Sequence, residues 1–238
     1  MKPWVHLDTA NVPGGTTQLR LMQRGDEFSI MVGTNELMNS RVSGSEQALA
    51  ELAAARIAGV PEPRVLIGGL GMGFTLRAAL EGFSAKSEIV VAELVPEVVT
   101  WARGQLLPVF GACLDDRRVE VLTGDVGRLI TTRKNHYDAV LLDVDNGPDG
   151  LSREQNDSLY QLSGLKKTLA ALRPGGVLAV WSSAPNASFT RRLTQAGFAA
   201  EEVKVRARKS GRGARHVIWI ATKAHQAPGQ PHARFKGN

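Results

Sequence analysis

The sequence is poor in cysteine, in aromatic residues and in long apolar runs, and each shortage excludes a class of protein. Its one cysteine, Cys113, can form neither an internal disulfide nor a cluster of cysteine metal ligands. Aromatic residues make up 5% of the chain, which argues against an aromatic-rich binding module. No apolar run reaches the roughly 18 to 20 residues of a membrane-spanning helix, and no signal-peptide stretch opens the chain. We therefore expect a cytoplasmic protein with no membrane partner.

The 238 residues, 43% of them hydrophobic, suffice for one full-sized domain with a small appendage. The formal charge of +6 is concentrated near the C-terminus, since nine of the 29 basic residues and two of the 23 acidic residues follow position 200. A locally clustered charge weakens the general argument from a basic protein to a nucleic-acid partner. The basic residues between 204 and 215 fit a solvated face, and a phosphate-binding patch is the alternative.

The first part of the chain predicts a small β extension over residues 1–42. Residues 18–23 and 28–32 form two short strand patterns around Arg24-Gly25-Asp26, a plausible hairpin turn. Ser43 to Glu46 then resembles a capping box, which opens a helix through about residue 58.

From residue 64 onward, apolar strand patterns alternate with helical patterns. Strands are expected at 64–69, 88–93, 118–125, 137–145 and 177–183, and helices at 74–80, from 96, at 154–172 and at 187–196. A long antiparallel hairpin, 202–207 with 215–221, follows. This order predicts an α/β, Rossmann-like fold with a mostly parallel sheet in a domain spanning 43–222, followed by a flexible tail, 223–238.

A glycine-rich turn, Gly69-Leu70-Gly71-Met72-Gly73, follows the first of these strands and opens a helix. Glycines there allow a tight turn and a close backbone approach to a ligand at the helix N-terminus, although tight packing alone would also explain them. We expect Gly69, Gly71 and Gly73 to bind a nucleotide. Phe74 replaces the third glycine of the dinucleotide pattern, which disfavours a nicotinamide dehydrogenase.

Acidic residues end the next strands. Glu93, 20 residues after Gly73, can accept hydrogen bonds from ribose hydroxyls, and the alternative is a solvated glutamate at a strand end. Asp125 could accept an adenine amino proton, and the alternative is the N-cap of a helix over 126–131. Because ligands of open α/β sheets bind beyond the carboxyl ends of the strands, one cleft could collect these groups.

The loop after the fourth strand, residues 143–149, is rich in acids. Carboxylates at this place could bind or deprotonate a cationic amine. We expect Asp143 or Asp145 to be the catalytic base, and Asn146 and Asp149 to contact the substrate. Ordinary turn composition is the structural alternative.

Taken in order, these segments resemble the class I S-adenosylmethionine-dependent methyltransferase fold. The segments are VLIGGLGMG, IVVAE, VEVLTGD, YDAVLLDVDNGP and LRPGGVLAV. Within that superfamily the sequence is similar to the spermidine synthase-like family of polyamine aminopropyltransferases, over roughly residues 17–182. The resemblance implies a seven-stranded sheet whose last two strands form the hairpin, and a small N-terminal β-domain that could pack in a homodimer. It also implies that the glycine loop, Glu93 and Asp125 hold an adenosyl nucleotide.

The sequence departs from the family pattern at three places. The family's loop aspartate, which helps to place the aminopropyl donor, aligns with Gly71, and its catalytic aspartate aligns with Asn146, beside Asp145. A tyrosine-histidine-glutamate stretch at the first helix is replaced by residues 44–47, where Glu46 alone is retained. The resemblance favours aminopropyl transfer, whereas the departures favour methyl transfer or another acceptor.

Three hypotheses follow. The first is a transferase that uses S-adenosylmethionine or its decarboxylated form to alkylate a small-molecule amine. The second is a methyltransferase that binds nucleic acid through the basic hairpin, and the third is a non-catalytic member of the family. We expect no metal, because the histidines lack metal-ligand spacing, and we assign Trp101, Trp181 and Trp219 to the core or its rim.

Overall fold

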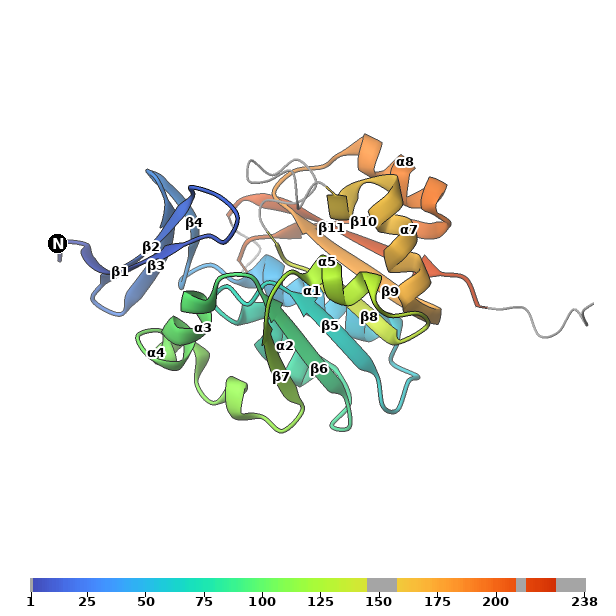
Figure 1. Cartoon of the computed structure of the whole chain (residues 1–238), viewed down its shortest axis with the longest axis horizontal. Coiled ribbons are helices and arrows are strands. Elements are labelled where there is room, and N and C mark those ends of the chain that lie inside the picture. The colour runs from blue at the N-terminus through green and yellow to red at the C-terminus, as the bar shows by residue number, and fades with distance from the viewer. Residues whose placement is uncertain (1, 145–157, 209–212, 226–238) are drawn as a thin grey trace, which may run out of the picture.

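The computed structural model describes residues 2–144, 158–208 and 213–225, which form two sheets (Figure 1). A four-stranded antiparallel sheet, in the order β1-β2-β3-β4, stands at the N-terminal end of the molecule. A seven-stranded sheet, in the order β10-β11-β9-β8-β5-β6-β7, makes the main body. No helix in the described part of the chain is long and apolar enough to cross a bilayer.

The N-terminal sheet is larger than the sequence predicts. Its strands are β1 (Val5–Asn11), β2 (Gln18–Arg24), β3 (Glu27–Val32) and β4 (Asn35–Asn39). The predicted hairpin is confirmed as β2 and β3, which pair antiparallel around Gly25. The outer strands were missed because they carry few buried side chains. In β1 only Ala10 is fully buried, so no alternation of apolar residues marks the strand.

The main sheet has the predicted, mostly parallel arrangement. Its strands are β5 (Arg64–Gly68), β6 (Glu88–Glu93), β7 (Val119–Thr123), β8 (Tyr137–Leu142), β9 (Leu172–Ser182), β10 (Phe198–Arg206) and β11 (Arg215–Lys223). Strands β5 to β9 pair in parallel, and β11 is antiparallel to both of its neighbours. Every residue of β8 is buried, as expected of a parallel strand that is covered on both faces.

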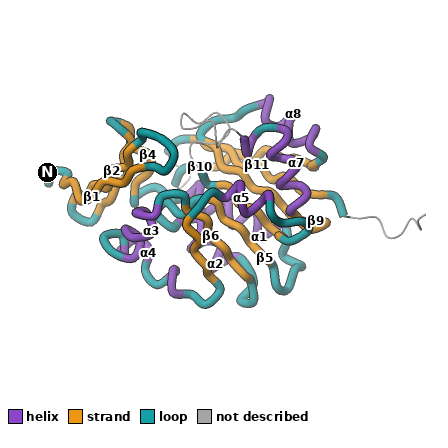
Figure 2. The backbone as a smooth tube through the Cα atoms, viewed as in Figure 1, coloured by secondary structure: helices purple, strands orange, loops and turns teal. Residues whose placement is uncertain are grey.

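Helices cover both faces of the main sheet (Figures 1 and 2). They are α1 (Gly44–Arg56), α2 (Phe74–Gly82), α3 (Pro96–Arg103), α4 (Leu107–Phe110), α5 (Val126–Thr131), α7 (Leu162–Ala171) and α8 (Ala187–Ala196), with a 3₁₀ turn, η1 (Cys113–Asp115). Successive residues of β5 point into two apolar cores on opposite faces of the main sheet, because the side chains of a strand alternate. Ile67 packs with α1, α2, α3 and the N-terminal sheet, and Leu66 packs with α5, α7 and α8.

Two local expectations were wrong. Ser43 occupies the N-cap of α1 but makes no side-chain capping bond, so the predicted capping box does not form. Glu46 instead accepts a hydrogen bond from the hydroxyl of Ser45, its neighbour in the first turn. Residues 173–176, where we expected no strand, belong to β9. Leu172 already pairs with Tyr137 of β8, and the register of this pairing shifts before Val177. The C-terminal hairpin is also longer than predicted.

A partly buried hydrogen bond joins the N-terminal sheet to the main body. The Trp101 indole N–H in α3 donates to Asp8 Oδ2 in β1 at 2.7 Å. The indole is fully buried, and this bond is the first cause that lowers the pKa of Asp8. The sheet is therefore fixed against α3, although the domain boundaries at 42/43 and 222/223 remain predictions.

We predict that Trp101→Phe lowers the free energy of unfolding by about 1–3 kcal/mol, because it keeps most of the ring and removes the only donor to Asp8 Oδ2 seen in the described residues. Urea denaturation followed by circular dichroism measures the change. Trp4→Phe is the matched control, since Trp4 is exposed, and its effect should stay within about 0.5 kcal/mol. Equal effects of the two substitutions would contradict this role of the bond.

Candidate functional site

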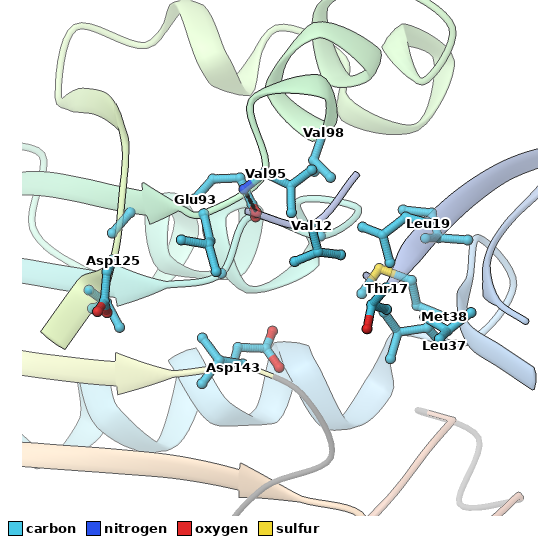
Figure 3. Close-up of a pocket in the computed structure, with 18 of the residues that line it drawn as sticks. Val12, Thr17, Leu19, Leu37, Met38, Glu93, Val95, Val98, Asp125 and Asp143 are labelled. Carbon is cyan, nitrogen blue, oxygen red and sulfur yellow. Dashed lines mark hydrogen bonds between the residues drawn. The ribbon is translucent and has the colours of Figure 1, made fainter. Parts of the chain in front are cut away.

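A pocket lies between the N-terminal sheet and the carboxyl ends of strands β5 to β8 (Figure 3). Glu93, Asp125 and Asp143 stand on the side of the main sheet, and Leu19 and Met38 face them from the N-terminal sheet. We call this cavity the first pocket. Its other described lining residues are Val12, Thr17, Ile30, Val32, Leu37, Gly69, Gly71, Ala92, Leu94, Val95, Val98, Gly124, Val126 and Val144.

The glycine loop is shaped by close contacts on both of its sides. Gly69 has a φ of +90°, and a Cβ there would lie 2.4 Å from the backbone oxygen of Asp143. Gly73 has a φ of +76°, and its Cβ would lie 2.5 Å from the Phe110 ring. Side chains do not fit at either position. The prediction that the loop forms a tight turn before a helix is confirmed, and its role in binding a nucleotide remains a prediction.

Glu93 is 7% exposed, which excludes the solvated strand-end alternative. Its Oε2 accepts from the Leu70 amide and its Oε1 from the Val95 amide, each at 2.8 Å. Burial raises the pKa of Glu93, and the backbone hydrogen bonds oppose this rise. The carboxylate therefore joins the glycine loop to the segment that opens α3, at the wall of the first pocket. The predicted ribose contact remains a prediction.

Asp125 is a helix N-cap, the role that we gave as the alternative to adenine binding. It is the N-cap of α5, and its Oδ1 accepts from the Gly127 amide at 2.7 Å. The side chain also lines the first pocket. The predicted contact with adenine remains a prediction that this geometry leaves open.

Asp143 follows the last residue of β8 and is half-buried in the wall of the first pocket. Its Oδ2 accepts from the Thr75 hydroxyl, in the first turn of α2, at 2.5 Å. Burial first and the nearby Glu46 carboxylate second raise the pKa of Asp143 to about 7. A carboxyl group with such a pKa can exchange a proton near neutral pH.

A second pocket adjoins the first and shares four of its lining residues. Its described lining residues are Leu37, Met38, Glu46, Leu70, Gly71, Met72, Phe74, Asp143 and Trp181. Glu46 and Asp143 are its only ionisable side chains among these residues, and the remaining walls are mostly apolar. Burial also raises the pKa of Glu46. Two carboxylates in an apolar cavity favour a cationic ligand, because a bound cation relieves their mutual repulsion.

Part of the predicted site cannot be placed. Asp145, Asn146 and Asp149 lie outside the described residues, so their proposed roles stay predictions. The structure adds Thr75 and Trp181 to the site. Thr75 carried a usable signal, because it stands in the helical turn directly after the glycine loop. Trp181, which we assigned to the core or its rim, gave no such signal.

The seven-stranded sheet with its antiparallel C-terminal strands confirms the predicted methyltransferase-type fold. A family model described as "S-adenosyl-L-methionine-dependent methyltransferase" matches residues 109–214. In the part of the chain that the structure describes, no group of three or more histidine, cysteine or acidic side chains could hold a metal ion.

Individual relatives have more specific names than the family model. The chain is 36% identical over 124 residues to polyamine aminopropyltransferase 2 of Pseudomonas aeruginosa, a match that covers 50% of this chain and 33% of that protein. It is 27% identical over 128 residues to a polyamine aminopropyltransferase of Saccharolobus islandicus, covering 54% of this chain and 41% of the relative. The chain thus matches less than half the length of these curated relatives.

Solved structures support the fold assignment. A spermidine synthase in complex with the transition-state analogue AdoDATO superposes with a TM-score of 0.72 at 17% identity, covering 92% of this chain and 72% of that one. The spermidine synthase of Thermotoga maritima gives a TM-score of 0.71 at 18% identity with the same coverage. The spermidine synthase-like resemblance is therefore confirmed, and the comparisons lend no support to the nucleic-acid or non-catalytic alternatives.

We predict that Asp143→Asn stabilises the fold at pH 8 by about 2–4 kcal/mol. The native pKa of about 7 exceeds the ordinary aspartate value of 3.8, so the native state binds more protons and the stability of the wild type falls as pH rises between these values. The amide removes that penalty while it can still accept from Thr75. The two proteins should converge toward pH 4.

Urea denaturation at pH 4.5, 6 and 8 measures this difference. Asp115→Asn is the control, because that side chain is 73% exposed and its effect should be small at every pH. A pH-independent difference between Asp143→Asn and wild type would exclude a raised pKa at Asp143.

Proposed function

We propose that this chain is a transferase that binds an S-adenosyl nucleotide and alkylates a small amine, with decarboxylated S-adenosylmethionine as the donor. One observation carries the proposal, namely that Asp143 lines both pockets. A nucleotide in the first pocket and an amine in the second would therefore meet at one carboxylate.

The first pocket suits the nucleotide part of the donor. The glycine loop brings backbone close to the cavity, and Glu93 and Asp125 stand at the ends of successive strands, where adenosyl groups bind in folds of this kind. Apolar side chains from the N-terminal sheet, among them Leu19 and Met38, face these polar groups across the cavity. The donor would thus lie between an apolar and a polar wall.

The charge of the pockets favours the decarboxylated donor. No lysine, arginine or histidine occurs among the described lining residues of either pocket, so the carboxylate of intact S-adenosylmethionine would lack a cationic partner there. An aminopropyl chain carries only an ammonium group, which the Asp143 carboxylate in the wall of the first pocket would attract. The printed names of the relatives, polyamine aminopropyltransferases, support the same choice.

In the proposed reaction the amine gives a proton to the Asp143 carboxylate and attacks the aminopropyl carbon bonded to sulfur. A C–N bond forms, the C–S bond breaks, and its electron pair stays on sulfur, which leaves as neutral 5′-methylthioadenosine. Placing both reactants at one carboxylate supplies proximity, and a pKa of about 7 suits Asp143 to act as base.

Methyl transfer is the second candidate, and Gly71 favours it. The family's donor-placing aspartate aligns with this position, where a Cβ would lie 3.1 Å from Met38 Sδ, so a longer side chain requires Met38 to move. In that case intact S-adenosylmethionine would donate its methyl group to the amine and leave as S-adenosylhomocysteine.

Calorimetric titration distinguishes these reactions. We expect decarboxylated S-adenosylmethionine and 5′-methylthioadenosine to bind at least 10-fold more tightly than S-adenosylmethionine and S-adenosylhomocysteine. Mass spectrometry of incubations with a panel of primary amines then identifies the alkylated product. The reverse order of affinities would assign methyl transfer, and no binding of any adenosyl ligand would refute the proposed function.

The amine-dependent rate should depend on pH through Asp143. We expect kcat/KM for the amine to fall as pH drops below about 7, because the protonated carboxyl cannot act as base. Asp143→Asn should lower kcat by about 10²–10⁴-fold without changing the dissociation constant of 5′-methylthioadenosine by more than about twofold. Stopped assays between pH 5.5 and 9 test this, and an active Asp143→Asn enzyme would exclude the residue as base.

A further inference from the structure

A chain of hydrogen bonds leads from the C-terminal hairpin into the second pocket. His216 Nδ1 in β11 lies 2.8 Å from Ser45 Oγ in α1. The Ser45 hydroxyl donates to Glu46 Oε2 at 2.7 Å, and Glu46 lines the second pocket. Residues that are 171 positions apart in the sequence are thereby joined at the wall of one cavity.

With Glu46 ionised, the direction of these hydrogen bonds follows from the donors available. Ser45 is fully buried, and its hydroxyl has a single proton, which it gives to the Glu46 carboxylate. The contact with His216 therefore requires His216 to donate from Nδ1, which selects the Nδ1–H tautomer. Both donations point toward the carboxylate and stabilise its negative charge.

The surroundings hold this chain of bonds in place. The amide of Gly44 donates to the backbone oxygen of Ala207 at 2.8 Å, which ties the start of α1 to the C-terminal hairpin. The ring of Trp181 contacts His216 edge to face, with centroids 4.9 Å apart, and Trp181 also lines the second pocket. His216 is therefore held between a hydroxyl and an aromatic wall of the cavity.

The two carboxylates of the second pocket have different partners. Asp143 accepts from Thr75, whereas Glu46 accepts from a serine that is itself supported by a histidine. Burial raises the pKa of both groups, and the hydrogen bond from Ser45 opposes this rise at Glu46. When two nearby acids have such different environments, one can remain charged while the other exchanges a proton.

We propose that Ser45 and His216 are positioning residues that keep the Glu46 carboxylate charged and fixed in the second pocket, where it binds the ammonium group of the amine acceptor. The inference rests on the proposed function and deepens it. Glu46 is the group that touches the acceptor, and Asp143 is left to take the proton. Ser45 and His216 act only through Glu46.

The test measures acceptor and donor separately. Putrescine and n-butylamine are titrated by calorimetry into protein saturated with 5′-methylthioadenosine, and steady-state rates are measured with decarboxylated S-adenosylmethionine. We expect Ser45→Ala and His216→Phe each to raise the KM and the dissociation constant of the amine about 10-fold or more. The kcat should change less than about threefold, and donor affinity less than about twofold, because neither residue lines the first pocket.

Two further variants separate positioning from packing. His216→Asn retains an N–H donor near the place of Nδ1 and should restore amine affinity to within about threefold of wild type. His136→Phe is the matched control, because His136 also contacts an aromatic ring edge to face, that of Tyr137 at 4.8 Å, yet lines neither pocket. It should leave the affinity of the amine unchanged. Nitrogen-15 NMR of the histidines should show His216 as the Nδ1–H tautomer.

Unchanged amine affinity in Ser45→Ala and His216→Phe would overturn the inference while the proposed function stands. A parallel loss of kcat, donor affinity and thermal stability, without rescue by His216→Asn, would assign a structural role only and would also overturn it. A wild-type protein that binds neither the adenosyl ligands nor the amines would instead refute the proposed function, and the inference with it.

Discussion

Two hydrogen bonds to the buried Glu93 carboxylate hold together the region on which the site depends. They fix the amides of Leu70 and Val95, and so they join the glycine loop after β5 to the segment after β6. With the loop in this position, the backbone of Asp143 approaches Gly69 so closely that no side chain fits between them. A surface glutamate could not do this, because water would compete for both amides. The buried charge is costly, and the backbone amides that it accepts from compensate for that cost.

Two acids, Glu46 and Asp143, share one largely apolar cavity, the second pocket. Glu46 stands on α1 and Asp143 directly after β8, and their charges raise the cost of ionising both at once. Hydrogen-bonding partners then decide how the two differ, since Thr75 supports one carboxylate and Ser45 the other. A cavity built in this way provides a charged group to attract a cation and a neighbouring group that can accept a proton. Amine alkylation requires both functions.

The sequence predicted the main sheet well because buried parallel strands are continuous apolar runs, and β8 is the clearest example. The acids at strand ends could also be predicted, because each stands at the end of an apolar run and ligands bind beyond the carboxyl ends of parallel strands. Two of the supporting contacts were not predictable, because those of Asp143 with Thr75 and of Ser45 with His216 join segments that are far apart in the sequence. The outer strands of the N-terminal sheet escaped detection because they bury too little to carry a pattern. No sequence pattern predicted that this sheet lies over the carboxyl ends of the main-sheet strands.

That placement matters most for the chemistry, because the N-terminal sheet forms a wall of both pockets. Met38 of β4 lies against Gly71, at the position where the family carries an aspartate, and it lines the first and the second pocket. An apolar thioether therefore faces the loop at a position where related proteins have a charge. In the proposed function, the carboxylate that would face a cationic donor tail is Asp143, directly after β8, rather than a side chain of the loop. In the proposed function this charge compensates for the absence of the loop aspartate at Gly71, which is the departure that favours methyl transfer.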